Sequence, residues 1–313
     1  MSIVTQTQTL TPEQQAAAIE ASWYTPPKPE IPSGWLVFSE EYILRGLRGD
    51  VAGRMGKPGP LLYATVKVVQ VLMAIAQGLI MLLALTPVIN LFLESAAVCF
   101  KRGTAGYFLR ACYWKAKLRR LGQDTLIDRG VEIWGPRNIE IGARCHIDTY
   151  VRLAAGESAF GQKGHIEIGD YAHLSPRVHL AGRGGLKVGD FVELGAGVHI
   201  YSASNQFLNP QAPGQLITLS HVAPERFQHV IEAPIEIADY AVVGFNSLLL
   251  PGTNLGKGSI VRPYSIITRK YPPFADVAGP GRATQVGWRR PTEIDPRCET
   301  GRHPGSAGNS DGR

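Results

Sequence analysis

The chain has 313 residues, 44% of them hydrophobic, and a formal net charge of +6. This composition excludes an intrinsically disordered protein, and the length allows two domains or one domain with substantial flanking segments. The positive charge favours an anionic partner, such as nucleic acid, an acidic membrane surface or a phosphorylated small molecule. The four cysteines are far apart and form no CxxC pair, so we predict no disulfide framework, no metal site and a reducing compartment.

The first part of the chain has two contrasting segments. Residues 1–60 are polar and proline-rich in places, which predicts a flexible N-terminal arm, with no cleaved secretory signal at its start. From Val68 to Leu93 no residue is charged, as burial in a bilayer requires. Lys and Arg flank this stretch on both sides, so the positive-inside rule favours a re-entrant hairpin, broken at Pro87, with both ends cytoplasmic. A helix buried in a soluble core is the alternative.

A basic helix is expected next, at about residues 106–120. Tyr107, Ala111, Trp114 and Leu118 fall at helical spacing, and cationic residues fill much of the rest, which is typical of an interfacial helix. A solvated helix capping a soluble domain is the alternative. We therefore expect residues 61–120 to bind an anionic membrane surface at the cytoplasmic face of the inner (plasma) membrane. Nucleic acid is not expected, because the cations gather around the apolar segment and no nucleic-acid-binding module is visible.

A six-residue repeat begins near Leu121 and predicts the fold of residues 121–290. Gly or Ala often follows the repeated aliphatic residue, and a small or β-branched residue often stands four positions after it. Short strands separated by sharp turns, stacked in about five coils, would produce this pattern. The aliphatic positions are Leu121, Ile127 and Ile133; Ile141, Ile147 and Leu153; Ile168, Leu174 and Leu180; Val188, Leu194 and Ile200; and Ile237, Val243, Leu249, Leu255, Val261 and Ile267.

This hexad resembles that of the hexapeptide-repeat acyltransferases. The resemblance implies a mainly β protein, a left-handed parallel β-helix that works as a homotrimer; the register alone does not give the handedness. A different β-solenoid is the alternative. The register breaks between Ile200 and Ile237, so residues 201–236 form a loop excursion of the kind that carries function. The tail, residues 291–313, is polar and glycine-rich and is expected to be disordered.

The start of the excursion resembles a known active-site turn. Residues 198–207, 238–259 and 268–282 resemble segments of the maltose and galactoside acetyltransferases, in which a histidine in this turn is the general base. Asn205 stands at that position, and an amide cannot accept the proton near neutral pH. Polysaccharide O-acyltransferases with the turn S-G-S-D-D-F match Ser202–Phe207, with both acidic residues replaced by amides here.

Other residues of the excursion offer a replacement base. His221 is the first candidate and His229 the second, oriented by Glu225 or Glu232. A loop histidine without a role is the alternative for His221. His179 and His199 face outward and are weaker candidates. We expect Asn205, Gln206 and Ser202 to hold the acceptor or the thioester carbonyl by hydrogen bonds.

The resemblance also implies a donor groove between neighbouring coils. Backbone groups near Gly244, Ser247, Pro263 and Ser265 would border the pantetheine arm of acetyl-CoA or another acyl-CoA, the expected co-substrate. The phosphates would meet the cations Arg262, Arg269, Lys270 and Arg282. A solvated basic face is the alternative for these cations.

The predicted function is acyl-CoA-dependent O-acyl transfer, most simply acetylation, to a sugar of a surface polysaccharide or of a lipid-linked glycan precursor. The membrane segment would hold the cleft near such a carbohydrate or glycolipid acceptor. The alternative is a catalytically inactive β-helix scaffold or glycan-binding trimer, because Asn205 replaces the histidine base. Binding of coenzyme A distinguishes the two.

Overall fold

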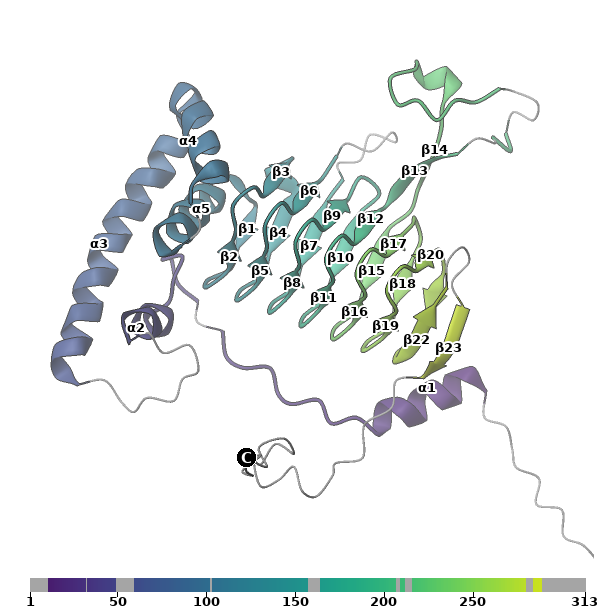
Figure 1. Cartoon of the computed structure of the whole chain (residues 1–313), viewed down its shortest axis with the longest axis horizontal. Helices are drawn as coiled ribbons and strands as arrows, with labels where there is room; N and C mark the ends of the chain where they lie inside the picture. The colour runs from purple at the N-terminus through teal and green to yellow at the C-terminus, as the bar shows by residue number, and fades with distance from the viewer. Residues whose placement is uncertain are drawn as a thin grey trace, which may run out of the picture.

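A computed structural model describes residues 11–31, 33–48, 59–101, 103–156, 164–206, 209–211, 216–279 and 284–288. Most of them form a parallel β-helix whose three sheets run side by side along one axis (Figure 1). The shortest sheet has six strands, so the described residues make six complete coils, where about five were expected.

Each sheet collects one strand from every coil. The first contains β1 (Arg120–Leu121), β4 (Ile139–Ile141), β7 (Ile166–Ile168), β10 (Leu186–Val188), β15 (Ile235–Ile237), β18 (Asn254–Leu255) and β21 (Lys270–Tyr271). The second contains β2 (Leu126–Ile127), β5 (His146–Ile147), β8 (His173–Leu174), β11 (Glu193–Leu194), β16 (Val242–Val243), β19 (Ile260–Val261), β22 (Ala275–Ala278) and, antiparallel to β22, β23 (Thr284–Trp288). The third contains β3 (Glu132–Trp134), β6 (Arg152–Ala154), β9 (His179–Ala181), β12 (His199–Tyr201), β17 (Leu248–Leu249) and β20 (Ile266–Ile267).

The predicted aliphatic ladder is confirmed as the core. From Ile141 onward every repeated aliphatic residue is at most 1% exposed, and partners stack in register, as Ile168 does between Ile141 and Val188. Leu121, Ile127 and Ile133 begin the first coil, as predicted. Strand residues beside the ladder point outward because side chains alternate along a strand. Outward residues at the same register position therefore form rows along each sheet.

Three helices cover the open N-terminal end of the β-helix: α3 (Pro60–Ala84), α4 (Pro87–Cys99) and α5 (Thr104–Lys117). The predicted break at Pro87 is confirmed, since proline is well tolerated at the first position of α4. Helix α5 differs from the interfacial helix that we expected. Tyr113 and Trp114 are at most 2% exposed, and the helix packs between α3, α4 and the first coil. The first coil has no preceding coil to bury its edge, and α5 fills that place.

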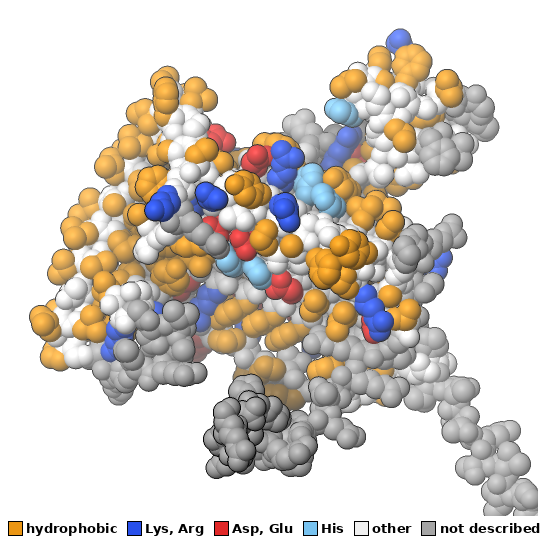
Figure 2. All heavy atoms as spheres, in the orientation of Figure 1, with side chains coloured by type: hydrophobic (Ala, Val, Ile, Leu, Met, Phe, Trp, Pro, Cys, Tyr) orange, Lys and Arg blue, Asp and Glu red, His pale blue; other side chains and the backbone are white. Residues whose placement is uncertain are grey.

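Helices α3 and α4 keep their apolar faces on the outside. Of the described helices, α3 alone is long and apolar enough to cross a membrane, and only 11% of its most apolar window is buried. Leu72, Ile75, Leu82 and Phe92 are each more than 60% exposed. Hydrophobic side chains accordingly cover the outer face of α3 and α4 (Figure 2). The alternative of a helix buried in a soluble core does not fit this exposure.

The described part of residues 1–60 is ordered against the β-helix, which corrects our prediction of a flexible arm. It contains α1 (Pro12–Ala21) and α2 (Glu40–Arg48), and the segment between them runs along the β-helix (Figure 1). Trp23 stacks on Phe274 with ring centroids 5.6 Å apart. Lys28 forms ion pairs with Asp170 and Asp190 of two successive coils. These contacts join sequence-distant residues, so composition alone did not reveal them.

Candidate functional site

The predicted excursion forms a hairpin arm that projects from the β-helix. Strand β13 (Ala203–Gln206) leaves the fourth coil after β12 and pairs antiparallel with β14 (His229–Glu232) (Figure 1). Between them lies the short 3-10 helix η2 (Glu225–Phe227). Because β14 leads directly into β15, the arm begins and ends at neighbouring coils, and its loop is held over the side of the β-helix.

A cavity of about 490 Å³ lies where the arm meets the β-helix. Its walls combine two histidines, a carboxylate, three amides and an arginine. The lining residues are Arg183, Asn205, Gln211, His221, Ala223, Glu225, Gln228, His229 and Val230. The structure thus brings together Asn205, His221, His229 and Glu225, which the sequence analysis had placed in one site.

Two amide side chains brace the loop that carries His221. The Asn205 Nδ2 group donates a hydrogen bond to the carbonyl oxygen of Leu219 at 3.0 Å. The Gln228 amide donates to the carbonyl oxygens of Ala223 and, at 3.5 Å, of His221. His221 itself is exposed to solvent at the cavity. Asn205 therefore positions this loop, a role for which an amide is suited.

Ser202 and Gln206 lie outside the cavity lining. Ser202 is fully buried; its hydroxyl donates to the carbonyl of Ala181 at 2.9 Å and accepts from the Gly184 amide at 2.8 Å. The predicted hydrogen bond from Ser202 to the acceptor substrate or the thioester carbonyl is therefore wrong, because this hydroxyl joins the base of the arm to the preceding coil. Gln206 is half-buried and pairs with His229 across the hairpin.

An ion pair closes the base of the arm. Arg183 lies in the turn after β9, and its Nε is 2.6 Å from an oxygen of Glu232, whose side chain is 5% exposed. Glu232 is therefore paired with Arg183. Of the two carboxylates predicted to orient His221, Glu225 is the one that lines the cavity together with His221. Arg183 was not predicted from the sequence, because it precedes the excursion by about a full coil and only the stacking of coils brings it to the arm.

The weaker candidates His179 and His199 lie beside the arm on the third sheet. The Tyr201 hydroxyl is 3.3 Å from His179 Nδ1, and the His179 and His199 ring centroids are 6.0 Å apart. Burial, and then the neighbours His199 and Arg152, lower the pKa of His179 below its usual value of 6.5. A histidine that stays neutral near pH 7 can accept a proton. This group is a second source of basicity close to the arm.

The predicted donor-binding residues lie on the last coils. Gly244 packs so closely on the next turn that a Cβ there would come within 2.5 Å of Pro263 N. The Ser247 and Ser265 side chains are 1% exposed and bond to the carbonyl oxygen of Arg262, so only their backbone could border a ligand.

The cations predicted to bind the donor phosphates differ in whether a carboxylate of the protein already pairs with them. The Arg262 guanidinium forms two hydrogen bonds with Asp276, at 2.8 and 3.0 Å, although its side chain remains 58% exposed. Arg269 and Lys270 are exposed where β20 leads into β21. Arg282 lies outside the described residues. Asp276 therefore already offsets the charge of Arg262, and Arg269 and Lys270 are the better candidates for phosphate contacts.

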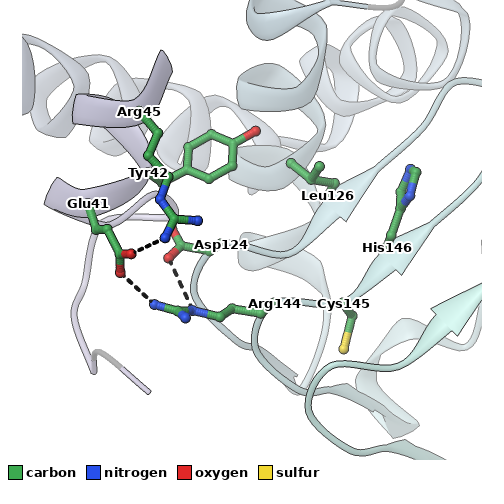
Figure 3. A pocket seen from close by; sticks show the side chains of 8 residues that line it. All are labelled: Glu41, Tyr42, Arg45, Asp124, Leu126, Arg144, Cys145 and His146. Atoms are coloured by element: carbon green, nitrogen blue, oxygen red, sulfur yellow. Dashed lines mark hydrogen bonds and ion pairs between the residues drawn. The ribbon is translucent and has the colours of Figure 1, made fainter. Parts of the chain in front are cut away.

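A smaller cavity, of about 210 Å³, lies between α2 and the first coils (Figure 3). Arg144 reaches across it to Glu41 at 2.8 Å, while the buried Asp124 carboxylate accepts hydrogen bonds from the Ser39 amide and hydroxyl, both at 2.6 Å. Burial raises the pKa of Asp124 above its usual value, and the bonds from Ser39 oppose this shift. These contacts dock the N-terminal segment on the β-helix.

Comparison with known proteins supports the fold. No family model matches the chain. A dTDP-4-amino-4,6-dideoxy-D-glucose acyltransferase from Escherichia coli is 26% identical over 149 residues, which cover 48% of this chain and 71% of that protein. A serine-to-alanine variant of AntD, an N-acyltransferase from Bacillus cereus, was solved with dTDP-4-amino-4,6-dideoxyglucose and coenzyme A. It matches 56% of this chain and 87% of its own, with 21% identity and a TM-score of 0.50.

A serine-to-cysteine variant of the same AntD, with the same two ligands, matches 59% of this chain and 91% of its own, with 20% identity and a TM-score of 0.50. These structures confirm the left-handed parallel β-helix that the family resemblance implied. Together with the relative from Escherichia coli, they point to the hexapeptide-repeat acyltransferases.

Proposed function

We infer that this β-helix is an acyl-CoA-dependent sugar acyltransferase, and we propose that it acylates a sugar hydroxyl in a surface polysaccharide or a lipid-linked glycan precursor. The observation that carries this proposal is the cavity under the arm, which gathers His221, His229, Glu225 and Asn205 on this fold. The similarity to sugar acyltransferases supports both the acyl-CoA donor and the sugar acceptor.

In this proposal His221 is the general base. Its imidazole takes the proton of the acceptor hydroxyl while the hydroxyl oxygen attacks the thioester carbonyl carbon of the acyl-CoA. The carbon–sulfur bond then breaks, the acyl group remains on the sugar oxygen, and the His221 imidazolium returns its proton to the coenzyme A thiolate. Glu225 lies in the same cavity, where its negative charge would stabilise the imidazolium. Asn205 acts through the loop it braces, as a positioning residue.

A second candidate reaction is N-acylation of a nucleotide-linked amino sugar. The comparisons favour it, since the relative from Escherichia coli is a dTDP-amino-sugar acyltransferase and AntD is an N-acyltransferase. The apolar surface of α3 and α4 favours a lipid-linked acceptor instead, because a soluble sugar nucleotide needs no membrane tether. The acceptor that reacts decides between the two.

The proposal includes the location and the assembly of the protein. We propose that α3 and α4 insert into the cytoplasmic face of the inner membrane, and that three chains associate as a homotrimer. The long exposed apolar face supports insertion, since an exposed surface of this size is unfavourable in water. Mass measurement of the detergent-solubilised protein tests the trimer, and a monomer would contradict it.

The function is tested with full-length detergent-solubilised protein, acetyl-CoA and two acceptors, a lipid-linked glycan and dTDP-4-amino-4,6-dideoxyglucose. Release of the coenzyme A thiol and the product mass are measured. We expect O-acetylation of the glycan, and His221→Asn should lower turnover by roughly 10²–10⁴-fold without weakening acetyl-CoA binding. His229→Asn, a change of the same kind in the same cavity, is the matched control and should have the smaller effect.

Each other outcome removes one part of the proposal. If only the amino sugar reacts, the enzyme is an N-acyltransferase. If His221→Asn retains full turnover, His221 is not the base, and His229, the other histidine of the cavity, becomes the next candidate. If the folded wild type does not bind acetyl-CoA, the scaffold alternative replaces the transferase for this donor.

A further inference from the structure

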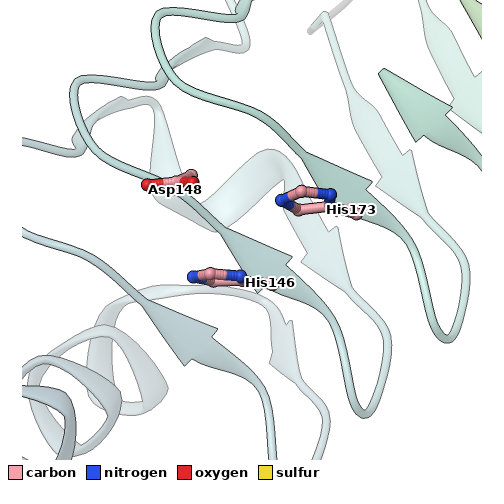
Figure 4. A group of neighbouring side chains, drawn as sticks. All are labelled: His146, Asp148 and His173. Atoms are coloured by element: carbon pink, nitrogen blue, oxygen red, sulfur yellow. The ribbon is translucent and has the colours of Figure 1, made fainter. Parts of the chain in front are cut away.

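A cluster of polar side chains on the second sheet is not used by the proposed acyl transfer. His146 on β5 and His173 on β8 occupy equivalent outward positions on adjacent strands, and Asp148 directly follows β5 (Figure 4). The two imidazoles are nearly parallel, with ring centroids 5.2 Å apart. All three side chains are half-buried, so the cluster is sheltered but open to solvent.

The three side chains can reach one common point. One nitrogen of each histidine and one carboxylate oxygen of Asp148 lie within 4.8 Å of one another. Donor atoms around a tetrahedral zinc ion lie about 3.4 Å apart, given bonds of about 2.0–2.2 Å. Small rotations of the side chains would close this difference, and the parallel strands already hold both imidazoles on the same side of the sheet.

Carboxylates outside the cluster orient both histidines. His173 Nδ1 is 2.9 Å from Glu193, which also accepts a hydrogen bond from the Ser175 hydroxyl at 3.0 Å. His146 Nε2 is 3.5 Å from the buried Asp128 carboxylate. In metal sites a histidine ligand commonly donates its second ring N–H to a carboxylate in this way, which leaves the other nitrogen for the metal.

One atom of the cluster is left without a partner. His173 Nε2 is inaccessible to solvent and has no hydrogen-bond partner in the described part of the chain. A buried polar atom without a partner costs free energy, so its presence calls for an explanation. A bound cation would supply the missing interaction, since Nδ1 faces Glu193 and Nε2 is the free nitrogen.

We propose that His146, Asp148 and His173 bind one divalent first-row transition-metal ion of the zinc class. Two imidazoles and one carboxylate match the ligand preference of zinc, whereas magnesium and calcium prefer oxygen ligands alone. Three protein ligands leave a coordination position for water or a ligand molecule. The ion would link the second and third coils. The prediction of no metal site rested on the cysteines alone, and none of the three ligands proposed here is a cysteine.

This proposal does not depend on the acyl-transfer proposal, and its test reads metal binding alone. Tag-free full-length protein in detergent is treated with a chelator, loaded with ZnCl₂ and desalted, and its zinc content is measured together with its melting temperature. We expect one tightly bound zinc per chain and a higher melting temperature with zinc, because an ion that binds only the folded state stabilises it. Loading with Co²⁺ should give visible absorption bands of a low-coordinate site.

The variants identify the ligands. His146→Ala with His173→Ala should abolish the bound zinc, and Asp148→Asn, a nearly isosteric change, should weaken zinc binding at unchanged secondary structure. Glu193→Gln should weaken it by roughly 10–100-fold through the outer carboxylate. The matched control is His179→Ala with His199→Ala, which removes the other pair of adjacent outward histidines; its zinc content should equal that of wild type.

Two results would overturn the site. One is folded wild-type protein that retains no zinc or Co²⁺ after desalting. The other is zinc retained at the wild-type level, with unchanged affinity, in both Asp148→Asn and the His146/His173 double variant. Should the double variant fail to fold, Asp148→Asn and Glu193→Gln decide the question on their own.

Discussion

Burial separates the polar residues that were predicted to contact substrate into two groups. Ser202, Ser247 and Ser265 are at most 1% exposed, and their hydroxyls hydrogen-bond to backbone groups, of a neighbouring coil for Ser202 and Ser247 and of its own turn for Ser265. Asn205 and His221 instead line an open cavity. The serines occupy small-residue positions of the repeat, where a hydroxyl can satisfy the amide or carbonyl of an adjacent turn. A position in the repeat therefore predicts packing better than it predicts catalysis.

The first residue-scale prediction concerns Ser202→Ala. The change removes the hydrogen-bond acceptor of the Gly184 amide at a buried side chain, whereas the Ala181 carbonyl keeps the hydrogen bond from the Ser202 backbone amide. We therefore expect a loss of about 1–3 kcal/mol in the free energy of unfolding. Turnover per folded molecule should change little. Chemical denaturation and a turnover assay measure the two quantities. Ser204→Ala on the half-buried β13 is the control and should cost less; lost turnover at unchanged stability would restore Ser202 as a substrate contact.

At the scale of elements, the N-terminal segment acts as a strap along the β-helix. Its contacts are concentrated at Trp23, Lys28 and Ser39, which meet the last coil, the middle coils and the first coil, respectively. Pairing Lys28 with Asp170 and Asp190 of successive coils joins those coils as well as holding the segment. The composition of the segment suggested flexibility because such pairings depend on residues far away in the sequence, 85 positions for Ser39 with Asp124 and 142 for Lys28 with Asp170.

The strap predicts a pH dependence of stability. Burial raises the pKa of Asp170, but hydrogen bonds from Lys28 and the Ala143 amide outweigh it and lower the pKa below the usual 3.8. The ionised carboxylate therefore stabilises the folded state above the usual pKa, and this contribution is lost as the pH falls through 3.8 and below. Lys28→Met should lower the melting temperature between about pH 5 and 7, and the difference from wild type should shrink below about pH 4.

The control for this prediction is Lys257→Met. It removes a longer ion pair of the same N-terminal segment, in which Lys257 Nζ lies 4.0 Å from a carboxylate oxygen of Glu20. It should lower the melting temperature less than Lys28→Met does. A difference between Lys28→Met and wild type that stays constant from neutral pH to pH 3 would show that the pairing with Asp170 is not its cause.

At the scale of the molecule, features that recur in every coil were predicted from the sequence, and contacts that form at a single place were largely missed. The aliphatic register predicted the core because each coil buries an aliphatic side chain at the same position. Leu174 and Leu194 accordingly stack in line with Ile147. The cavity was predicted only in part: His221 and Asn205 share one local excursion, whereas Arg183 reaches it from the preceding coil. The pairing of His146 with His173 was missed, although the register of Ile147 and Leu174 was predicted, because only cysteine motifs were considered for a metal site.

The last prediction concerns the outer face of α3. Leu72 and Ile75 are 61% and 66% exposed, so replacing both with Glu leaves the packing against α5 and the β-helix intact. A charged side chain at the centre of a bilayer costs on the order of 2.5–3.5 kcal/mol, and two should abolish stable insertion.

Flotation with anionic vesicles measures binding: wild type should float and the double variant should not. Leu219→Glu with Val222→Glu, at 56% and 81% exposure on the arm, is the matched control and should float like wild type. If the α3 variant floats as well as this control, the outer face of α3 does not insert into the membrane, and its exposed apolar side chains are better explained as a contact surface for another protein.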